Sequence, residues 1–142
     1  MATPAGDVST ILTGIGLTPG TNLFVGQMPE YSQDKGVPHE CVAMVDAGGL
    51  SPNPKYDRDL IYIQFQVRSA KDDYESGYNL AYSIKNSLLG RDSVTINNSL
   101  YTLFILEGDI NYLGDDSFGR SKFSFRFRVV RDNYSSSDRD DL

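Results

Sequence analysis

The chain has 142 residues, a formal net charge of −6 at pH 7 and a hydrophobic fraction of 39%. One domain of this length buries roughly two-thirds of its unfolded surface, so we expect a folded chain with a single core. The acidic balance argues against nonspecific nucleic-acid binding, the lone Cys41 excludes an intrachain disulfide, and no apolar run approaches the roughly 20 residues that span a membrane. A soluble protein made in the cytoplasm is therefore expected.

The first predicted element is a short helix over residues 6–17. Apolar side chains recur at helical spacing within it: Val8, Ile11, Leu12 and Ile15. Either Thr3 or Asp7 can cap its N-terminus, because both side chains carry an oxygen that accepts from a free backbone N–H. Gly16 is expected to end the helix, since glycine readily adopts the left-handed conformation that follows a last helical turn.

Strands are predicted next at 22–28, 40–46 and 60–68, with a proline-containing loop at 48–59. The clearest strand is 60–68, because apolar and polar side chains alternate along it. Its apolar face consists of Ile61, Ile63, Phe65 and Val67. A final strand at 122–131 alternates in the same way, with Phe123, Phe125, Phe127 and Val129 on its apolar face. These two faces are expected to enter the core.

A long helix is predicted over 70–89, with Ser69 as its N-cap and Gly90 as its stop. Its apolar stripe contains Tyr74, Tyr78, Ala81, Ile84 and Leu88. Gly77 would allow this stripe to approach whatever lies beneath it closely. At about 1.5 Å per residue the helix would be about 30 Å long, enough to cover a sheet.

A hairpin is predicted from 93–96 and 100–106, because Asn97-Asn98 between them tolerates positive φ. Strands that are consecutive or joined by hairpins favour antiparallel pairing. The predicted fold class is therefore α+β, a two-layer domain in which the long helix and the short N-terminal helix pack on one face of a mainly antiparallel sheet. The domain is predicted to span 1–132, followed by a mobile acidic, Ser-rich tail over 133–142.

No group of residues in the sequence predicts catalysis, a cofactor or a metal site. His39 and Cys41 lie two residues apart, but no third group nearby would orient them as a base and a nucleophile. The acidic segment 109–116 lacks the alternate spacing and closing Glu of a calcium-binding loop, so it is interpreted as a charged turn. Gly14-Ile15-Gly16 ends a helix, whereas a phosphate-binding loop begins one. We predict a protein that is not an enzyme.

The polar faces of the two amphipathic strands carry basic residues although the chain is acidic: Arg68, Lys122, Arg126 and Arg128. This basic face either keeps an exposed sheet soluble or pairs with acidic groups of a neighbouring subunit. Charged pairs of the second kind set register and partner choice more than they add affinity. The candidate interface set also includes Tyr62, Asp115, Asp116 and Arg120.

Three pieces between residues 60 and 131 carry a resemblance through their order and spacing. They are the strand Ile61-Tyr62-Ile63-Gln64-Phe65-Gln66-Val67-Arg68 before the tyrosine-bearing helix, the hairpin Val94-Thr95-Ile96-Asn97-Asn98-Ser99-Leu100-Tyr101, and the segment Leu113-Gly114-Asp115-Asp116-Ser117-Phe118-Gly119-Arg120. In this arrangement the chain resembles the minor capsid or tail terminator (tail completion) proteins of tailed bacteriophages.

The resemblance implies a structural virion protein of the tail and neck. Such proteins form a ring, usually of six subunits, at the head-proximal end of the tail tube, where the ring stops tube polymerisation and joins the tail to the head or neck. The implied partners are further copies of the chain in a hexamer, the tail tube protein and the neck connector, with assembly in the host cytoplasm. Genomic DNA would pass through the bore without specific binding, which the acidic balance suits.

A second hypothesis is a neck or head-tail connector adaptor, or another non-enzymatic binding module, that acts as a monomer with the same fold. Its contact set would be the aromatic residues Tyr31, Tyr56 and Tyr62. Because fold alone does not separate the two hypotheses, the state of assembly in solution is the feature that distinguishes them.

Overall fold

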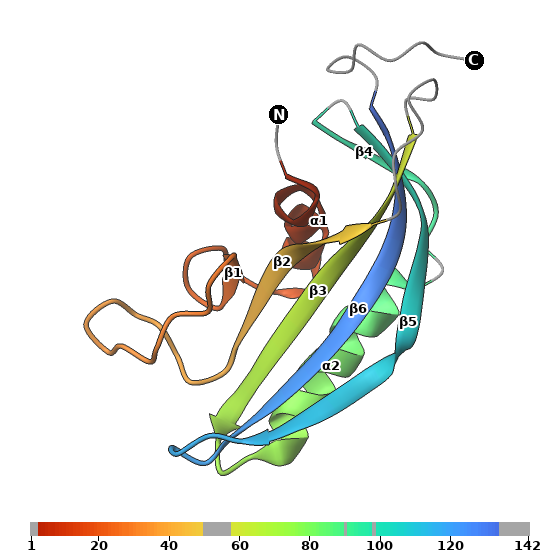
Figure 1. Ribbon diagram of the computed structural model, residues 1–142. Coiled ribbons are helices and arrows are strands. Elements are labelled where there is room, and N and C mark those ends of the chain that lie inside the picture. The colour runs from red at the N-terminus through yellow and green to blue at the C-terminus, as the bar shows by residue number, and fades with distance from the viewer. Residues whose placement is uncertain (1–2, 50–57, 90, 98, 134–142) are drawn as a thin grey trace.

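The computed structural model describes residues 3–49, 58–89, 91–97 and 99–133. In this part of the chain the sheet has six strands: β1 (Leu23–Val25), β2 (Cys41–Gly49), β3 (Arg58–Lys71), β4 (Val94–Ile96), β5 (Ser99–Asp115) and β6 (Arg120–Asn133). The helices are α1 (Pro4–Leu12), which continues into the 3-10 turn η1 (Thr13–Ile15), and α2 (Tyr74–Leu88). The strands lie in the order β1-β2-β3-β6-β5-β4, with β1 and β2 parallel and the other neighbours antiparallel (Figure 1).

The core lies between the sheet and the helices. The predicted apolar faces of β3 and β6 pack into it: Ile61 is only partly buried, and the other predicted inward residues are buried, namely Ile63, Phe65, Val67, Phe123, Phe125, Phe127 and Val129. The rings of Phe65 and Phe125, which oppose each other in the register of these strands, stack with centroids 4.9 Å apart. Burying each side chain of this size stabilises the fold by roughly 1.5–3 kcal/mol before conformational entropy is counted.

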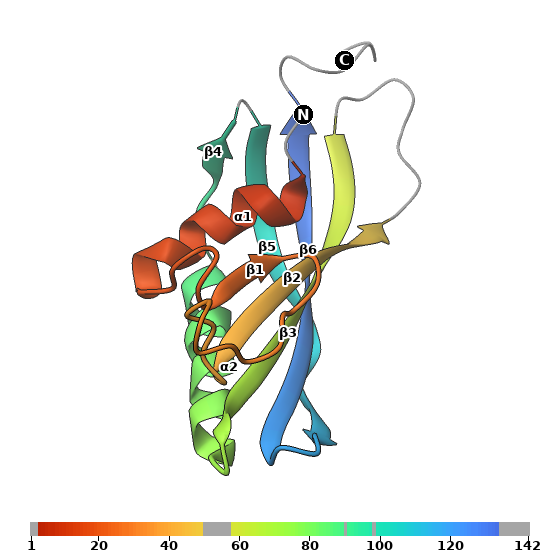
Figure 2. The ribbon, with the colours of Figure 1, turned by 90° about the vertical axis from the view of Figure 1, so that its left-hand side faces the viewer.

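Helix α2 covers one face of the long strands, as the turned view shows (Figure 2). Its buried residues are Gly77, Ala81, Ile84 and Leu88. Gly77 is needed for this close packing, because a Cβ there would lie 2.7 Å from Cε2 of Phe123 and 2.7 Å from Cβ of Ser69. Helix α1 adds Val8 and Leu12 to the same core. No helix of the described residues lies on the other face of the sheet.

The predicted α+β fold class with a long helix is wrong. The described chain is mostly a curled, mixed sheet, and α2 has only 15 residues. The expected first helical turn instead continues β3, because Lys71 pairs with Arg120 of β6 and the Ser69 hydroxyl accepts a hydrogen bond from the Ser121 N–H. The N-cap is Asp73, whose carboxylate accepts from the Ser76 N–H.

Strand β5 is the second reason for the larger share of sheet. The prediction ended it near residue 106 and placed a charged turn over 109–116, whereas β5 continues to Asp115. Three interruptions of its register with β6 lie along the strand, and Gly108 and Gly114 have φ angles of 75° and 105° there. Glycine adopts these angles readily, so the strand can bulge and still remain paired on both sides of each bulge.

The N-terminal helix is close to its prediction. The Thr3 side chain accepts from the Gly6 N–H as the N-cap, and Gly16 ends the segment with a φ of 97°. The Asp7 carboxylate is buried and accepts from the Tyr101 hydroxyl and, at 2.7 Å, from Nδ2 of Asn97. These bonds attach α1 to the β4–β5 hairpin.

The predicted end of the domain at residue 132 remains a prediction. Strand β6 ends at Asn133, and the predicted tail beyond it lies outside the described residues, as do residues 50–57 of the predicted loop and Gly90. No helix in the described part of the chain has the length and apolar character needed to cross a membrane.

Candidate interaction face

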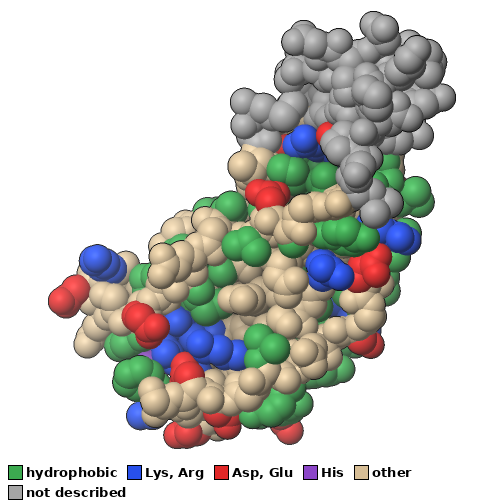
Figure 3. All heavy atoms as spheres, in the orientation of Figure 1, with side chains coloured by type: hydrophobic (Ala, Val, Ile, Leu, Met, Phe, Trp, Pro, Cys, Tyr) green, Lys and Arg blue, Asp and Glu red, His purple; other side chains and the backbone are tan. Residues whose placement is uncertain are grey.

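The face of the sheet opposite the helices is the candidate interaction surface. We call the outward residues of its two central strands the open face: Tyr62, Gln64, Gln66, Lys122, Ser124, Arg126 and Arg128. Register places Tyr62 opposite Arg128, and Gln64 opposite Arg126. Uncharged polar surface fills the middle of this side, with basic groups next to acidic ones around it (Figure 3).

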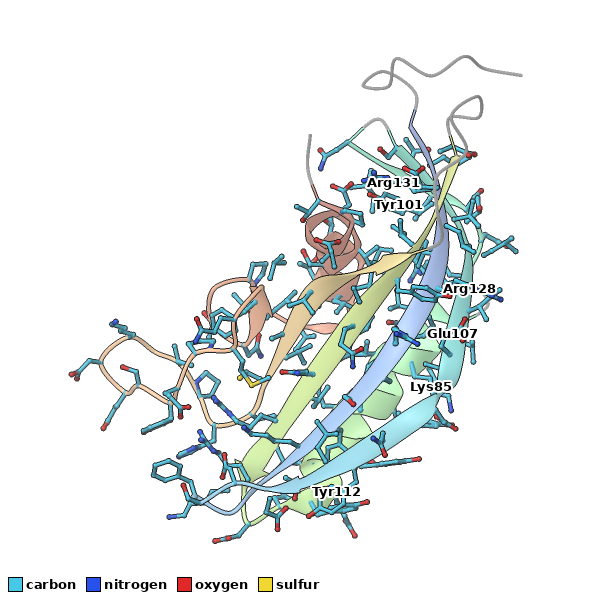
Figure 4. All side chains as sticks on the ribbon, viewed as in Figure 1. Lys85, Tyr101, Glu107, Tyr112, Arg128 and Arg131 are labelled. Atoms are coloured by element: carbon cyan, nitrogen blue, oxygen red, sulfur yellow. The ribbon has the colours of Figure 1, made fainter. Side chains whose placement is uncertain are left out.

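Two of its arginines are held by neighbours but stay within reach of solvent. The guanidinium of Arg126 lies 4.7 Å from the centroid of the Tyr62 ring, a cation–π arrangement. Nε of Arg128 lies 3.4 Å from Oε1 of Glu107, with 36% and 32% of the two side chains exposed. Figure 4 shows this pair on adjacent strands. Lys122 is exposed as well, so this region presents three cationic side chains, two of which are held by neighbours.

Arg68, predicted as part of the exposed basic face, is instead buried, with only 2% of its surface exposed. Residues 26–40 cover it, and its guanidinium donates to the backbone carbonyls of His39, Pro29 and Pro38 at 2.6, 2.8 and 3.0 Å. Burial lowers the pKa of Arg68 from its usual value, but an arginine this basic stays charged. The residue therefore fastens the covering segment to the sheet.

Arg120 is also buried and serves the β5–β6 turn. Its Nε donates to Oδ2 of Asp116 at 2.8 Å, and its Nη2 donates to Oε2 of Glu30 at 3.2 Å. Oδ1 of Asp116 accepts from the N–H groups of Phe118 and Arg120. Burial acts to raise the pKa of Asp116, but these hydrogen bonds outweigh it and hold the pKa below its ordinary value. Arg120 and Asp116 thus shape the turn.

Asp115 faces a different set of neighbours from Asp116. Its Oδ1 accepts from the hydroxyl of Ser121 at 2.7 Å and from that of Tyr112 at 2.8 Å. These two bonds lower the pKa of Asp115, so the carboxylate is ionised at neutral pH. The predicted interface set is therefore divided among the open face, a turn at one end of the sheet, and the buried Arg68 under the covering segment.

A groove of about 410 Å³ lies where the covering segment meets the sheet. It is lined by Gly26, Gln27, Met28, Glu30, Gln66, Val67, Arg68, Leu113, Lys122 and Phe123. Lys122 and Glu30 give it one exposed charge of each sign, whereas Arg68 is already bonded to backbone. Nothing in this lining resembles a nucleophile with its base.

His39 and Cys41 do not form a reactive pair. The His39 ring stacks on Tyr31 with centroids 4.0 Å apart, while Cys41 is completely buried in β2. Burial raises the pKa of the Cys41 thiol, which keeps it protonated and unreactive. Among the described residues, no group of three or more His, Cys, Asp or Glu side chains could hold a metal ion.

Sequence reasoning missed an exposed aromatic surface along α2. Tyr74 and Tyr78 were assigned to the buried stripe, yet they are 49% and 40% exposed, and Tyr82 next to them is 46% exposed. The i, i+4, i+8 spacing of three tyrosines was the available signal, because a hydroxyl at each position suits the edge of a core better than its centre.

The described part of the chain thus presents a polar open face and exposed tyrosines, and aromatic residues are enriched where proteins contact one another. The family model described as "Bacteriophage tail terminator protein" matches residues 11–133, so the chain belongs to this family. The predicted resemblance is confirmed, and the match extends it to residues 11–59. A search of curated proteins finds no match.

Proposed function

We propose that this chain assembles into a closed ring at the head-proximal end of the tail tube. There the ring stops tube polymerisation and joins the tail to the head or neck, without catalysing a reaction. Family membership is the observation that carries the proposal. Six copies are expected, and the partners are the tail tube protein and the neck connector in the virion, with assembly in the host cytoplasm.

The chain's physical properties support this role. A sheet with one face covered by helices and one face open can use the open side for contacts without unfolding. A head-to-tail contact between two different surfaces produces a ring when the rotation closes. The net charge of −6 would repel DNA in the bore, so the genome could slide through it.

Mass in solution tests the proposal. Light scattering coupled to size exclusion would be run on the chain alone and with the tail tube protein. We expect a closed oligomer near six copies, either alone or on the tube. A chain that stays monomeric under both conditions would contradict the ring and favour the neck adaptor, whose contact set would then include Tyr31 and Tyr62; Tyr56 lies outside the described residues.

Arg126→Glu tests whether the open face takes part. It should leave the monomer folded, because Arg126 is exposed, and reduce assembly or tube binding about tenfold or more. Lys35→Glu in the covering segment is the matched control, since it makes the same change of charge at an exposed site away from the open face. Equal assembly of the two variants would remove the open face from the interface.

A further inference from the structure

A second surface of the molecule has the features of an interface. We call it the tyrosine row: Tyr74, Tyr78 and Tyr82 of α2, and Tyr112 of β5. Each ring is between 40% and 49% exposed. The row follows the flank of α2 that faces β5, where Lys85 of the helix bonds Asp109 of the strand at 3.0 Å. Figure 4 shows Lys85 and Tyr112 along this side of the molecule.

The rings are held in place before any partner arrives. Tyr78 and Tyr82 stack at 6.3 Å, and Tyr74 meets the edge of Tyr112 at 5.2 Å. Tyr74, Tyr78 and Tyr112 also rest on the buried Phe123 at 5.1, 6.1 and 5.6 Å. A surface that is already ordered loses little side-chain entropy on binding, and tyrosine is enriched at the centres of interfaces.

The neighbouring edge of β5 is poorly suited to strand addition. Beyond Tyr101, no described strand pairs with its outer side. However, Leu103, Gly108 and Gly114 lie at or beside the breaks in the β5–β6 register, with φ angles of 54°, 75° and 105°. Bulges of this kind are a way of protecting an edge from pairing with another chain. Side chains of the tyrosine row are therefore the better contact on this flank.

The chemistry of the row is complementary to that of the open face. Exposed carboxylates lie along it, on Glu75, Asp109 and Asp115, next to the phenol rings. The open face offers Lys122 and Arg126. Within one molecule Arg126 already lies over Tyr62, so the same cation–π contact is available between molecules.

We propose that the tyrosine row is the docking surface for the open face of a second copy of this chain. Helix α2, which carries three residues of the row, lies on the other side of the sheet from the open face (Figure 1, Figure 2). The contact between these two different surfaces therefore runs head to tail, and in a pair one copy keeps a free open face while the other keeps a free tyrosine row. Repeating this contact builds the ring, and the inference therefore rests on the proposed function.

A mixing experiment with two variants tests the pairing. Tyr82→Glu damages the row, and the new carboxylate lies three residues from Lys85, which favours folding of the helix. Arg126→Glu damages the open face. Each variant alone should be monomeric by light scattering under the conditions in which wild type assembles. An equimolar mixture should double the mass to a 1:1 dimer and stop there, because the contact uses the one intact surface of each partner and leaves only the two damaged surfaces free.

The controls separate folding from docking. Ser83→Glu places the same charge on the opposite flank of α2 and should assemble like wild type. Thermal melting by circular dichroism would check each variant, and Tyr82→Ala replaces Tyr82→Glu if the latter does not fold.

The outcomes distinguish the two proposals. If wild type assembles but the mixed variants form no dimer, the row does not dock on the open face, while the ring stands. If Tyr82→Glu assembles normally and loses only tube binding, the row contacts the tail tube and the inference is overturned. Wild type that never assembles overturns the ring and this inference together.

Discussion

The side of the sheet opposite the helices contains one region that another segment covers and one region that is exposed. At one end, Arg68 of β3 lies under residues 26–40 and donates to three of their carbonyl groups. In the middle, no segment among the described residues covers Arg126 of β6, which rests on Tyr62 in contact with solvent. An arginine on this side of the sheet thus holds the fold together in one region and is a candidate contact residue in the other. The role of each arginine depends on whether a segment distant in sequence covers it.

The largest expected effect comes from Arg68→Ala, which would break this contrast at the covered end. It leaves the carbonyls of Pro29, Pro38 and His39 without their donor, and each buried group left unsatisfied costs about 1–3 kcal/mol. We expect a loss of about 3–5 kcal/mol in the free energy of unfolding by urea denaturation. Limited proteolysis should also cut first within 26–40.

Arg68→Lys tests whether the guanidinium group itself is needed to hold the covering segment. An ammonium group is compact and cannot reach three separated carbonyls as a planar guanidinium does, so about half of the loss should remain. If both substitutions cost less than about 1 kcal/mol, the covering segment does not depend on Arg68.

Asp116→Asn should have the next largest effect, about 1–3 kcal/mol, because it weakens the charged bond to the buried Arg120. It should also change the acid dependence. The folded pKa of Asp116 is depressed, so its contribution is present above the ordinary Asp pKa of about 3.9 and is lost as the pH falls through the lower folded value. Urea midpoints between pH 7 and pH 2 would show a smaller decline in the variant than in wild type.

Arg126→Ala tests the uncovered region and should change the stability of the monomer by no more than about 1 kcal/mol. An exposed cation–π contact is weak, and the guanidinium regains water when Tyr62 is left alone. A loss as large as that of Arg68→Ala would show that the middle of the open face is also structural. Urea denaturation below the assembly concentration is the appropriate measurement.

Glu107→Gln should have the smallest effect, at most about 0.5–1 kcal/mol, since its ion pair with Arg128 is partly exposed. The contribution should shrink further as salt rises, because ions screen exposed charges. A difference from wild type that stays constant between low and high salt would contradict this reading.

Local patterns predicted what is local in this fold. Alternation along β3 and β6 was enough to identify Phe65 and Phe125 as core residues, because side-chain direction in a strand follows its period of two. The prediction that Ser69 caps α2 failed, because the pairing of β3 with β6 places that residue in the sheet. The length of β5 depended on the same long-range pairing.

The candidate site was predicted less completely than the core. Sequence placed Arg68 and Arg126 on one face, which is correct for their strands, but contained no sign of the segment that covers Arg68. The tyrosines of α2 were read as core residues because periodicity identifies a stripe without locating its centre. Only the packing of Gly77 and Ala81 against the sheet shows that Tyr78 and Tyr82 lie at its margin.

The bond between Asp7 and Tyr101 also constrains the order of events during synthesis. Its partners are 94 residues apart, and the bond from Asn97 to Asp7 spans 90. At about 5–20 residues per second, a ribosome would need roughly 5–20 s after making Asp7 to supply these partners. Helix α1 therefore gains these two bonds only late in translation. Pulse-labelling hydrogen exchange during refolding should find α1 protected no earlier than β5.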